Sequence, residues 1–538
     1  MFDRRKYRAK DKPGSATAQQ PRGRLLQLQR LKRAVAQTSP VTGEVMPAGG
    51  EFRKHEDEDR SFHGSRLRMN PNVVKAQYAV RGEIVNRAKI VSQEVAQGKH
   101  PFDTVVWCNI GNPQKVGQQP ITFIRQLLSL CEYPQLLDNP AVTQLFPSDV
   151  CERARALIAD VPGGTGSYSE SPGVPALRRM VAEAVQRRDG GCKCDPEDIY
   201  LLDGASAGVH LMMRLLLRPA ENDAMLVPIP QYPLYSATLA LYGGSLVPYY
   251  LDEDQAWGLN IDELKKALAE ARRKGQCVRA IAVINPGNPT GQCLSYENQV
   301  DIIKLCAEED LVLIADEVYQ ENVYASSKKF TSFKKVATET GLAYKFPIVS
   351  LHSTSKGFIG ECGRRGGFME MIGFPDAARD QIFKLASINL CPNISGQIAT
   401  SLMMNPPQEG EPSYELYMKE KTGILESLKR RATTLVSSLN KLEGVTCNEA
   451  EGALYAFPRI RLPARAVEAA AEQGKSPDGF YCMEMLMNTG IVVVPGSGFG
   501  QKDGTYHFRT TFLPSESEIG SVIERLSKFH ADFLKKYS

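Results

Sequence analysis

Short apolar runs alternate with longer amphipathic stretches from about residue 70 onward. Apolar runs of four or five residues bounded by glycine, proline or polar residues predict buried strands. Apolar residues at helical spacing predict helices, as at 207–217 and 296–309. The expected strands are 199–203, 225–228, 280–284, 311–315 and 347–351. Because strands alternate with helices, the pattern predicts an α/β fold with a parallel sheet between two helical layers.

The pattern changes after Pro406 and Pro407. Residues 414–442 carry apolar side chains at helical spacing and predict one long helix. Shorter strand-like and helix-like segments follow it to residue 538. We therefore expect a second, smaller domain that is hinged by the long helix, and the sequence contains no internal repeat.

Composition narrows the class of protein without identifying it. Hydrophobic residues make up 42% and charged residues 23%, as in an ordinary soluble globular protein. A net charge of +4 over 538 residues gives no reason to expect a nucleic-acid or membrane partner. Twelve cysteines are scattered along the chain and only Cys192 and Cys194 are close together, so we expect reduced thiols rather than disulfides or a metal site.

The first 60 residues differ from the rest. They are rich in Arg, Lys, Gln, Pro and Ser, and Asp3 and Asp11 are the only acids before Glu44. Such a segment buries too little surface to offset its ordering entropy, so we expect a disordered tail. Its basic, acid-poor character is typical of an organelle transit peptide, and a basic amphipathic stretch at 25–33 favours mitochondria. A plain disordered tail or an altered gene start is the alternative.

Residues whose side chains could take part in catalysis or ligand binding follow the expected strands. Parallel sheets bind ligands at this end of their strands. Lys356 comes after the strand at 347–351, behind Ser353 and Ser355 and before Gly357. Small residues let a bulky group approach the backbone, and a lysine in such a setting forms Schiff bases with aldehydes. A solvated lysine after a strand is the alternative, so this residue needs support from the others.

That support comes from the neighbouring strands. Asp316 closes the strand at 311–315 and is either a helix cap or the carboxylate that keeps a pyridine nitrogen protonated. Tyr319 follows by three residues, on the same side of a turn or helix start. Asn288 lies in an Asn-Pro-Gly-Asn-Pro-Thr-Gly loop after the strand at 280–284, and this loop is either a tight connection or part of the same site.

Three further features suit a phosphate and a carboxylate. Residues 204–208 are small and lead into a helix, whose free N–H groups bind phosphate. Arg364 and Arg365 follow Lys356 by eight and nine residues, and an arginine clamps phosphate with paired hydrogen bonds. Arg509 lies in an apolar run at 507–512, where a substrate carboxylate would be a natural partner.

Taken in order, these motifs resemble the fold-type I aminotransferases, the aspartate aminotransferase superfamily. The resemblance runs from about residue 75 to the end of the chain. It rests on Gly-Asn-Pro at 111–113, Tyr168 with the run to Arg178, Pro-Gly-Asn-Pro-Thr-Gly at 286–291, Ala-Asp-Glu-Val-Tyr at 315–319, Ser-x-x-Lys at 353–356 with Arg364, and Arg509.

Within that superfamily, the chain resembles the alanine aminotransferase branch. The runs that carry this likeness are 109–114, 117–123, 188–191, 494–500 and 507–512. A neighbouring branch, the glutamate:glyoxylate aminotransferases, typically ends in a peroxisomal tripeptide. This chain ends Lys536-Tyr537-Ser538, which does not match that signal.

The resemblance implies a fold and its boundaries. The large domain would hold a mostly parallel seven-stranded sheet between helices, and the N- and C-terminal parts would together form a smaller α+β domain. We expect a basic extension over 1–65, the N-terminal part of the small domain over 66–130, the large cofactor-binding domain over 131–410, and the long helix with the rest of the small domain over 411–538.

The resemblance also implies pyridoxal 5′-phosphate as cofactor, no metal, and a homodimer. Lys356 would be the catalytic Schiff-base lysine. The residues expected to bind the cofactor with it are Ala205, Ser206, Tyr232, Asn288, Asp316, Tyr319, Ser353, Ser355, Arg364 and, from the other subunit, Tyr168. Gly111, Asn288 and Arg509 would bind the substrate. Tyr232 would stack on the cofactor ring, with a plain core aromatic as the alternative.

The implied reaction is a ping-pong transamination of L-alanine and 2-oxoglutarate to pyruvate and L-glutamate, in mitochondria or cytoplasm. Alternatives are a glutamate:glyoxylate aminotransferase and a lyase such as an aminocyclopropane-carboxylate synthase, which would keep Lys356, Asp316 and Arg509. A cofactor-binding transcription regulator would need a winged helix, and residues 1–70 lack that periodicity. No residue is assigned to the distal carboxylate of glutamate, although Arg125 is conceivable.

Overall fold

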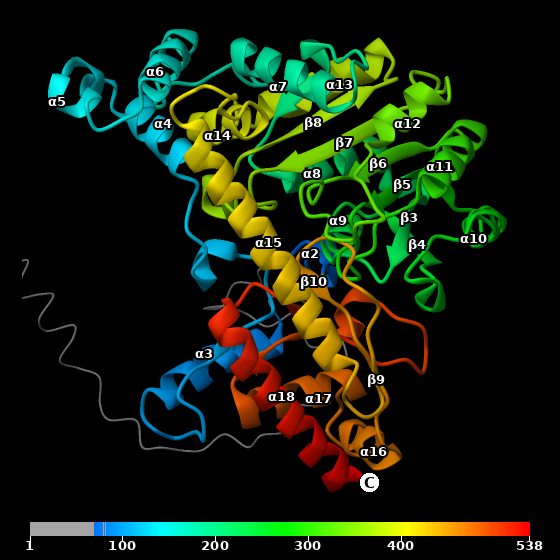
Figure 1. The fold of residues 1–538 in the computed structure, drawn as a ribbon. Helices are drawn as coiled ribbons and strands as arrows, with labels where there is room; N and C mark the ends of the chain where they lie inside the picture. Colours follow the sequence, from blue (N-terminus) through cyan, green and yellow to red (C-terminus); the bar gives the residue numbers. More distant parts are fainter. Residues whose placement is uncertain (1–68, 79, 81) are drawn as a thin grey trace, which may run out of the picture. The chain divides into compact units, whose positions relative to one another are not determined.

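The computed structural model describes residues 69–538, apart from residues 79 and 81. The extension expected over 1–65 and its possible helix lie outside the described residues. The described residues cluster as one compact unit. Figure 1 shows its helices and strands, and no helix of the described part is long and apolar enough to cross a membrane.

A seven-stranded sheet forms the centre of the large domain. Its strand order is β2-β8-β7-β6-β5-β3-β4, and every neighbouring pair is parallel except the two pairs that contain β8. This confirms the mostly parallel, seven-stranded sheet that the resemblance implied. The strands are β2 Ile199–Leu201, β3 Asp223–Ile229, β4 Ser245–Tyr250, β5 Cys277–Ile284, β6 Val312–Asp316, β7 Ile348–Ser353 and β8 Gly367–Ile372.

Five of these strands overlap the runs predicted from the apolar pattern. β4 and β8 were not predicted. In each strand, a physical feature interrupts the apolar pattern on which the prediction relied. β4 is an edge strand with a proline and two exposed positions. β8 carries Glu370 in its buried centre, where Lys334 from the neighbouring helix neutralises it.

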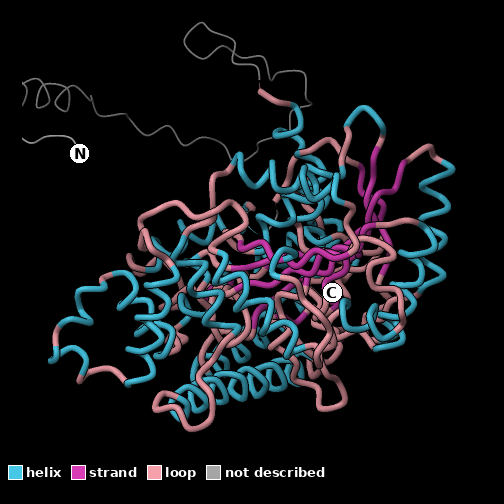
Figure 2. The backbone as a smooth tube through the Cα atoms, turned by 90° about the horizontal axis from the view of Figure 1, so that it is seen from above, coloured by secondary structure: helices cyan, strands magenta, loops and turns pink. Residues whose placement is uncertain are grey.

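Helices cover both faces of this sheet (Figure 2). Alternate residues of one strand separate the two layers: Ala280 and Ala282 of β5 pack on one side, and Ile281 and Val283 on the other. The helices of this region are α4 Thr122–Glu132, α5 Pro140–Thr143, α6 Ser148–Asp160, α7 Pro175–Arg188, α8 Ala205–Leu216, α9 Leu234–Leu241, α10 Ile261–Arg273, α11 Tyr296–Glu309, α12 Phe333–Glu339, α13 Asp376–Ile388 and α14 Ile394–Met404.

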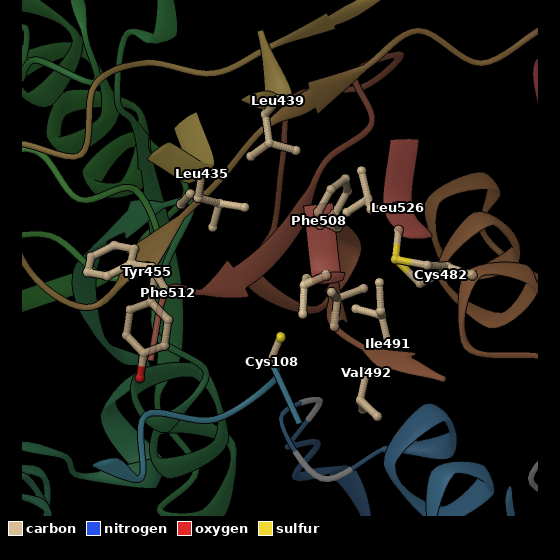
Figure 3. Close-up of a cluster of buried hydrophobic side chains, with 14 of the residues drawn as sticks. Cys108, Leu435, Leu439, Tyr455, Cys482, Ile491, Val492, Phe508, Phe512 and Leu526 are labelled. Atoms are coloured by element: carbon tan, nitrogen blue, oxygen red, sulfur yellow. The ribbon is translucent and has the colours of Figure 1, made fainter. Parts of the chain in front are cut away.

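A second core joins segments from both ends of the described chain. Figure 3 shows Cys108 beside Ile491, Val492 and Phe508 in this cluster, and strand β1 pairs in parallel with β12. Its elements are α2 Pro71–Lys75, α3 Glu83–Val95, β1 Val106–Trp107, α15 Tyr414–Leu439, β9 Val445–Thr446, β10 Tyr455–Ala456, β11 Arg459–Ile460, α16 Ala464–Glu472, α17 Pro477–Thr489, β12 Ile491–Val492, β13 Val494–Pro495, β14 Phe508–Thr511 and α18 Glu516–Tyr537.

Helix α15 is the long helix that the sequence predicted, and it ends three residues earlier than expected. It runs from α4 to α18 and β10 (Figure 1), so it contacts both cores. The domain boundary expected at residue 130 falls inside α4. The buried side chains of α4 pack with α6, α7 and α14, so core membership changes between Cys108 and Ile121 rather than at residue 130.

Candidate active site

Three candidate residues come from three adjacent strands. In the sheet, β5, β6 and β7 lie side by side in parallel. Their carboxyl ends therefore meet at one edge, and they deliver Asn288, Asp316 and Lys356 to it. This is where the sequence predicted the site, because ligands of open parallel sheets bind beyond the carboxyl ends of the strands.

Asp316 is a buried carboxylate with one satisfied oxygen. Alternation along β6 places it on the same face as Val312 and Ile314, which pack with α8 and α9. Its Oδ2 accepts a hydrogen bond of 3.0 Å from the Tyr235 hydroxyl, and its Oδ1 has no partner among the described residues. Burial raises the pKa of Asp316 to about 6, against the lowering effect of Tyr235 and Lys356.

The amine of Lys356 lies close to the segment around residue 111. Its Nζ donates to the carbonyl oxygen of Gly111 at 3.4 Å and lies 5.6 Å from the ring centre of Tyr319. Asn288 Nδ2 is 3.5 Å from the Tyr319 hydroxyl. The structure therefore brings together four residues predicted from the sequence, namely Gly111, Asn288, Tyr319 and Lys356.

Arg509 is fully buried on β14, where its guanidinium contacts two polar groups and two aromatic rings. Its Nη1 donates to Asn288 Oδ1 at 3.0 Å, and a second nitrogen donates to the carbonyl of Asn109. Its guanidinium carbon lies 4.1 Å from the ring centre of Tyr455 and 4.7 Å from that of Phe499. Its Nε has no acceptor within the described part of the chain, so an anion from outside would complete it.

Small residues and an arginine form a cradle at the start of α8. Gly204 precedes the helix with a φ of 81°, a conformation that favours glycine, and Ala205 and Ser206 begin the first turn. Arg365 donates to the carbonyl of Asp203 at 3.0 Å and to Ser206 Oγ at 3.4 Å. The free N–H groups of the helix and this guanidinium suit a phosphate.

The serines before Lys356 line the same region. Ser353 Oγ donates to the carbonyl of Gly366 at 3.3 Å and accepts from the backbone N–H of Ser355. The hydroxyl of Ser355 is buried and has no partner among the described residues. It is therefore available to a phosphate oxygen.

The predicted Arg364, and Arg125, which was only conceivable as a partner of the distal carboxylate, lie elsewhere. Arg364 points away from the cradle and forms a 2.8 Å ion pair with Glu132 at the end of α4. Arg125 is held by both carboxylate oxygens of Glu361 and by Gln114, so it does not offer a free cation to a distal carboxylate.

The predicted Tyr232 is partly buried and the predicted Tyr168 is exposed. Tyr232 follows β3, and its hydroxyl lies 2.6 Å from that of Tyr78. Tyr168 is 79% exposed on the loop before α7, where this chain alone gives it no ligand to reach. Its predicted contact with another subunit stays a prediction.

The pattern search missed several residues of the site. Tyr235 carries the hydrogen bond to Asp316, Tyr455 lies under Arg509, and Asn109 accepts from Arg509. Tyr235 had one available signal, because it lies three residues after Tyr232 at the start of α9. Tyr455 sits in a two-residue strand, which is too short to show alternation.

The geometry agrees with a family match. Residues 138–526 match the family of class I and II aminotransferases. The chain belongs to this family. Among its relatives, alanine aminotransferase 1, mitochondrial, of Arabidopsis thaliana is 57% identical over 87% of each chain. Glutamate–glyoxylate aminotransferase 1 of the same plant is 50% identical over 87% of this chain and 96% of that one.

Solved structures agree with the aminotransferase fold. Alanine aminotransferase from Pyrococcus furiosus superposes with a TM-score of 0.68 at 26% identity, over 86% of this chain and all of that one. The named relatives include a probable mitochondrial alanine aminotransferase of Dictyostelium discoideum, at 53% identity over 87% of this chain and 88% of that one. The fold-type I aminotransferase resemblance inferred from the motifs is therefore confirmed.

Proposed function

We propose that this aminotransferase uses pyridoxal phosphate to transfer the amino group of L-alanine to 2-oxoglutarate. The observation that carries the proposal is the set of buried, unsatisfied polar atoms around Lys356. Asp316 Oδ1, Ser355 Oγ and Arg509 Nε are each buried without a partner in the described chain. Because each leaves a desolvated group unpaired, the set marks a site built for a polar ligand.

These residues fit the cofactor group by group. Asp316 would hold a proton at the pyridine nitrogen, Asn288 and Tyr319 would meet the ring oxygen, and Lys356 would bind the aldehyde carbon. When bound, pyridoxal phosphate supplies an electron-withdrawing ring that stabilises negative charge at the α-carbon of the amino acid.

The cradle at α8 would hold the phosphate. We assign the arginine of this cradle as Arg365 rather than the predicted Arg364, since Arg365 reaches Ser206 whereas Arg364 pairs with Glu132. The α8 N-terminus, Ser353 and Ser355 would complete it. Tyr232 follows the adjacent strand β3 and is proposed to lie against the ring face.

The remaining chemistry belongs to side chains of the chain. Arg509 binds the α-carboxylate of the amino acid, and Asn288 and Gly111 border this position. Lys356 Nζ would then take the α-proton of the bound amino acid and hold it for its return during the same half-reaction. Both substrates use the same residues in turn, so the kinetics should be ping-pong.

Alanine is proposed over glyoxylate-linked substrates because the relatives named for alanine include higher identities than those named for glutamate and glyoxylate, 57% against 50%. Assays with alanine plus 2-oxoglutarate and with glutamate plus glyoxylate would separate the two. A higher kcat/KM for glutamate with glyoxylate would overturn the substrate assignment and leave the aminotransferase chemistry intact.

Two further proposals concern assembly and location. We place Tyr168 at the phosphate of a second copy, because it is highly exposed yet belongs to a motif of the family. We also propose mitochondrial import, supported by the basic, acid-poor first 60 residues and by relatives named as mitochondrial. Fusing residues 1–60 to a fluorescent reporter tests the second proposal, and a cytosolic signal would contradict it.

A further inference from the structure

Tyr455 lies between the two cations of the site. It is a buried residue of β10, and its ring centre is 4.1 Å from the guanidinium carbon of Arg509. The same ring meets Tyr319 edge-on, at 6.2 Å between ring centres and an angle of 83°. In Figure 3, Tyr455 lies at the edge of the small-domain core rather than in its middle. One side chain therefore contacts both the carboxylate-binding arginine and a residue expected at the cofactor ring.

The hydroxyl of Tyr455 lies beside the amine of Lys356. A Cβ added to Gly111 would come within 2.4 Å of the Tyr455 hydroxyl oxygen and within 3.3 Å of Lys356 Nζ. Both polar groups therefore border the space beside the α-carbon of Gly111. The phenols of Tyr455 and Tyr319 are also close enough that each shifts the pKa of the other. The position of the Tyr455 hydroxyl explains why residue 111 has room only for glycine.

The charges around the phenol support a specific role for it. Burial alone raises the pKa of Tyr455, but the cations Lys356 and Arg509 and the hydrogen bond with Tyr319 outweigh burial and lower it. The pKa of Tyr319, by contrast, is raised well above its usual value by burial and by Tyr455. Of this pair, Tyr455 is the phenol that ionises first.

We propose that Tyr455 is a positioning residue for transamination, whose ring fixes the guanidinium of Arg509 and whose hydroxyl fixes Lys356 and Tyr319. This inference rests on the function proposed above. The ring and the hydroxyl of Tyr455 should affect different kinetic constants. The ring governs binding of the amino-acid carboxylate, whereas the hydroxyl governs the proton-transfer steps at Lys356.

The other face of Arg509 offers a matched control. Phe499 lies 4.7 Å from the guanidinium carbon and has no hydroxyl, so it shares only the first of the two roles. Substituting Phe499 should therefore reproduce the loss of the ring of Tyr455 without the loss of its hydroxyl.

The first test separates KM from kcat in the holoenzyme. For Tyr455→Phe, we expect kcat to fall about five- to tenfold, the value of one lost hydrogen bond, with the KM for alanine within about twofold. For Phe499→Leu, we expect the KM for alanine to rise about fivefold with kcat retained, from the loss of one cation–π contact. Tyr455→Leu should show both effects.

The second test measures the ionisation of the Tyr455 phenol and does not depend on catalytic turnover. Phenolate absorbance is followed as pH rises, in the wild type, in Tyr455→Phe and in Tyr235→Phe. We expect a phenol that ionises below the ordinary tyrosine range in the wild type and in Tyr235→Phe, and its loss in Tyr455→Phe. The pKa of Tyr235 is raised well above its usual value by burial and by Asp316, so Tyr235 does not contribute there.

A failure of the role proposed for Tyr455 can be distinguished from a failure of the proposed function. A wild-type protein that makes no pyruvate would overturn the function, and the titration would still show whether Tyr455 lies between the two cations. A Tyr455→Phe variant that matches the wild type in kcat and in its titration would overturn the role of the hydroxyl. A Tyr455→Leu variant with an unchanged KM would overturn the role of the ring.

Discussion

Ionisation of the Asp316 carboxyl lowers the stability of the folded protein when no cationic partner is bound. Its carboxyl is buried, one oxygen is unpaired, and its pKa is raised from 3.8 to about 6. A carboxyl with a raised pKa favours the folded state only while it is protonated, so its ionisation destabilises the fold as pH rises from about 4 to about 6. The cost above pH 6 is about 3 kcal/mol.

Asp316→Asn should therefore stabilise the cofactor-free protein by about 3 kcal/mol at pH 8 and have little effect at pH 4. Urea unfolding at the two pH values measures this difference. The same variant should lose roughly 10²-fold or more in kcat, since the ring nitrogen loses its charge partner. A variant that is less stable than the wild type at pH 8 would contradict the placement of Asp316.

Gly111 provides a second residue-scale prediction. Gly111→Ala places a methyl group 2.4 Å from the Tyr455 hydroxyl oxygen, so activity should fall sharply. Tyr455→Phe removes that oxygen, and the nearest remaining atoms are a ring carbon at 3.2 Å and Lys356 Nζ at 3.3 Å. The double variant should therefore be more active than Gly111→Ala alone. Equal or lower activity of the double variant would show that the clash lies elsewhere.

At the scale of elements, the loop after Lys356 decides which arginine meets the phosphate. A 3₁₀ turn over Cys362–Arg364 and a left-handed residue at Arg365, with a φ of 51°, reverse the direction of the chain. Residue spacing alone cannot reveal that turn, so the sequence favoured Arg364, whereas Arg365 is the arginine that reaches Ser206 and that we propose for the phosphate.

Arg365→Ala should weaken pyridoxal phosphate binding by about tenfold or more, because it removes a charge-assisted hydrogen bond to the phosphate. Arg364→Ala should change the affinity by less than threefold, since it breaks only a half-exposed ion pair with Glu132. Cofactor titration of the stripped variants, followed by absorbance, gives both constants. The reverse ranking would restore the prediction made from the sequence.

A buried ion pair holds α12 against the sheet. Lys334 and Glu370 pair with almost no solvent exposure. Lys334→Met leaves Glu370 buried and unpaired, so the free energy of unfolding should drop by roughly 3–5 kcal/mol. Lys334→Met combined with Glu370→Met removes both charges and should recover most of that loss. A double variant no more stable than the single one would contradict this account.

The sequence predicted the parts of the fold that follow simple periodicities. β5, β6, α11 and α15 were recognised because each carries a long, regular apolar pattern. β8 escaped because Glu370 interrupts its apolar run, and its neutralising partner lies 36 residues earlier in the chain. Asn288, Asp316 and Lys356 were found because each lies at the end of a strand or within four residues after it, whereas Tyr455 depends on a two-residue strand and long-range packing.

At the scale of the whole molecule, we propose that the site is shared between two copies of the chain. Tyr168 is exposed to the extent of 79% in the single chain, which leaves its side chain open to contact by a second copy. A dimer formed from a Lys356→Ala chain and a Tyr168→Ala chain would contain one site with both wild-type residues.

Mixing these two inactive or weakened variants under subunit exchange should restore activity, because the Tyr168→Ala chain keeps Lys356 and receives Tyr168 from its partner. Mixing Lys356→Ala with Asp316→Asn is the control for the same geometry. Those two residues belong to the site of one and the same chain, so each site of the exchanged dimer lacks one of them and activity should not recover. No recovery in the first mixture would place Tyr168 outside the site.

The central claim is that Lys356, Asp316 and Arg509 form a site that takes the amino group from alanine before any second substrate arrives. The most direct test is a single-turnover reaction of the purified holoenzyme with L-alanine alone. The account predicts about one pyruvate per chain in the absence of 2-oxoglutarate, together with a change in cofactor absorbance, and none of either with Lys356→Ala. A wild-type enzyme that forms no pyruvate until 2-oxoglutarate is added would contradict it.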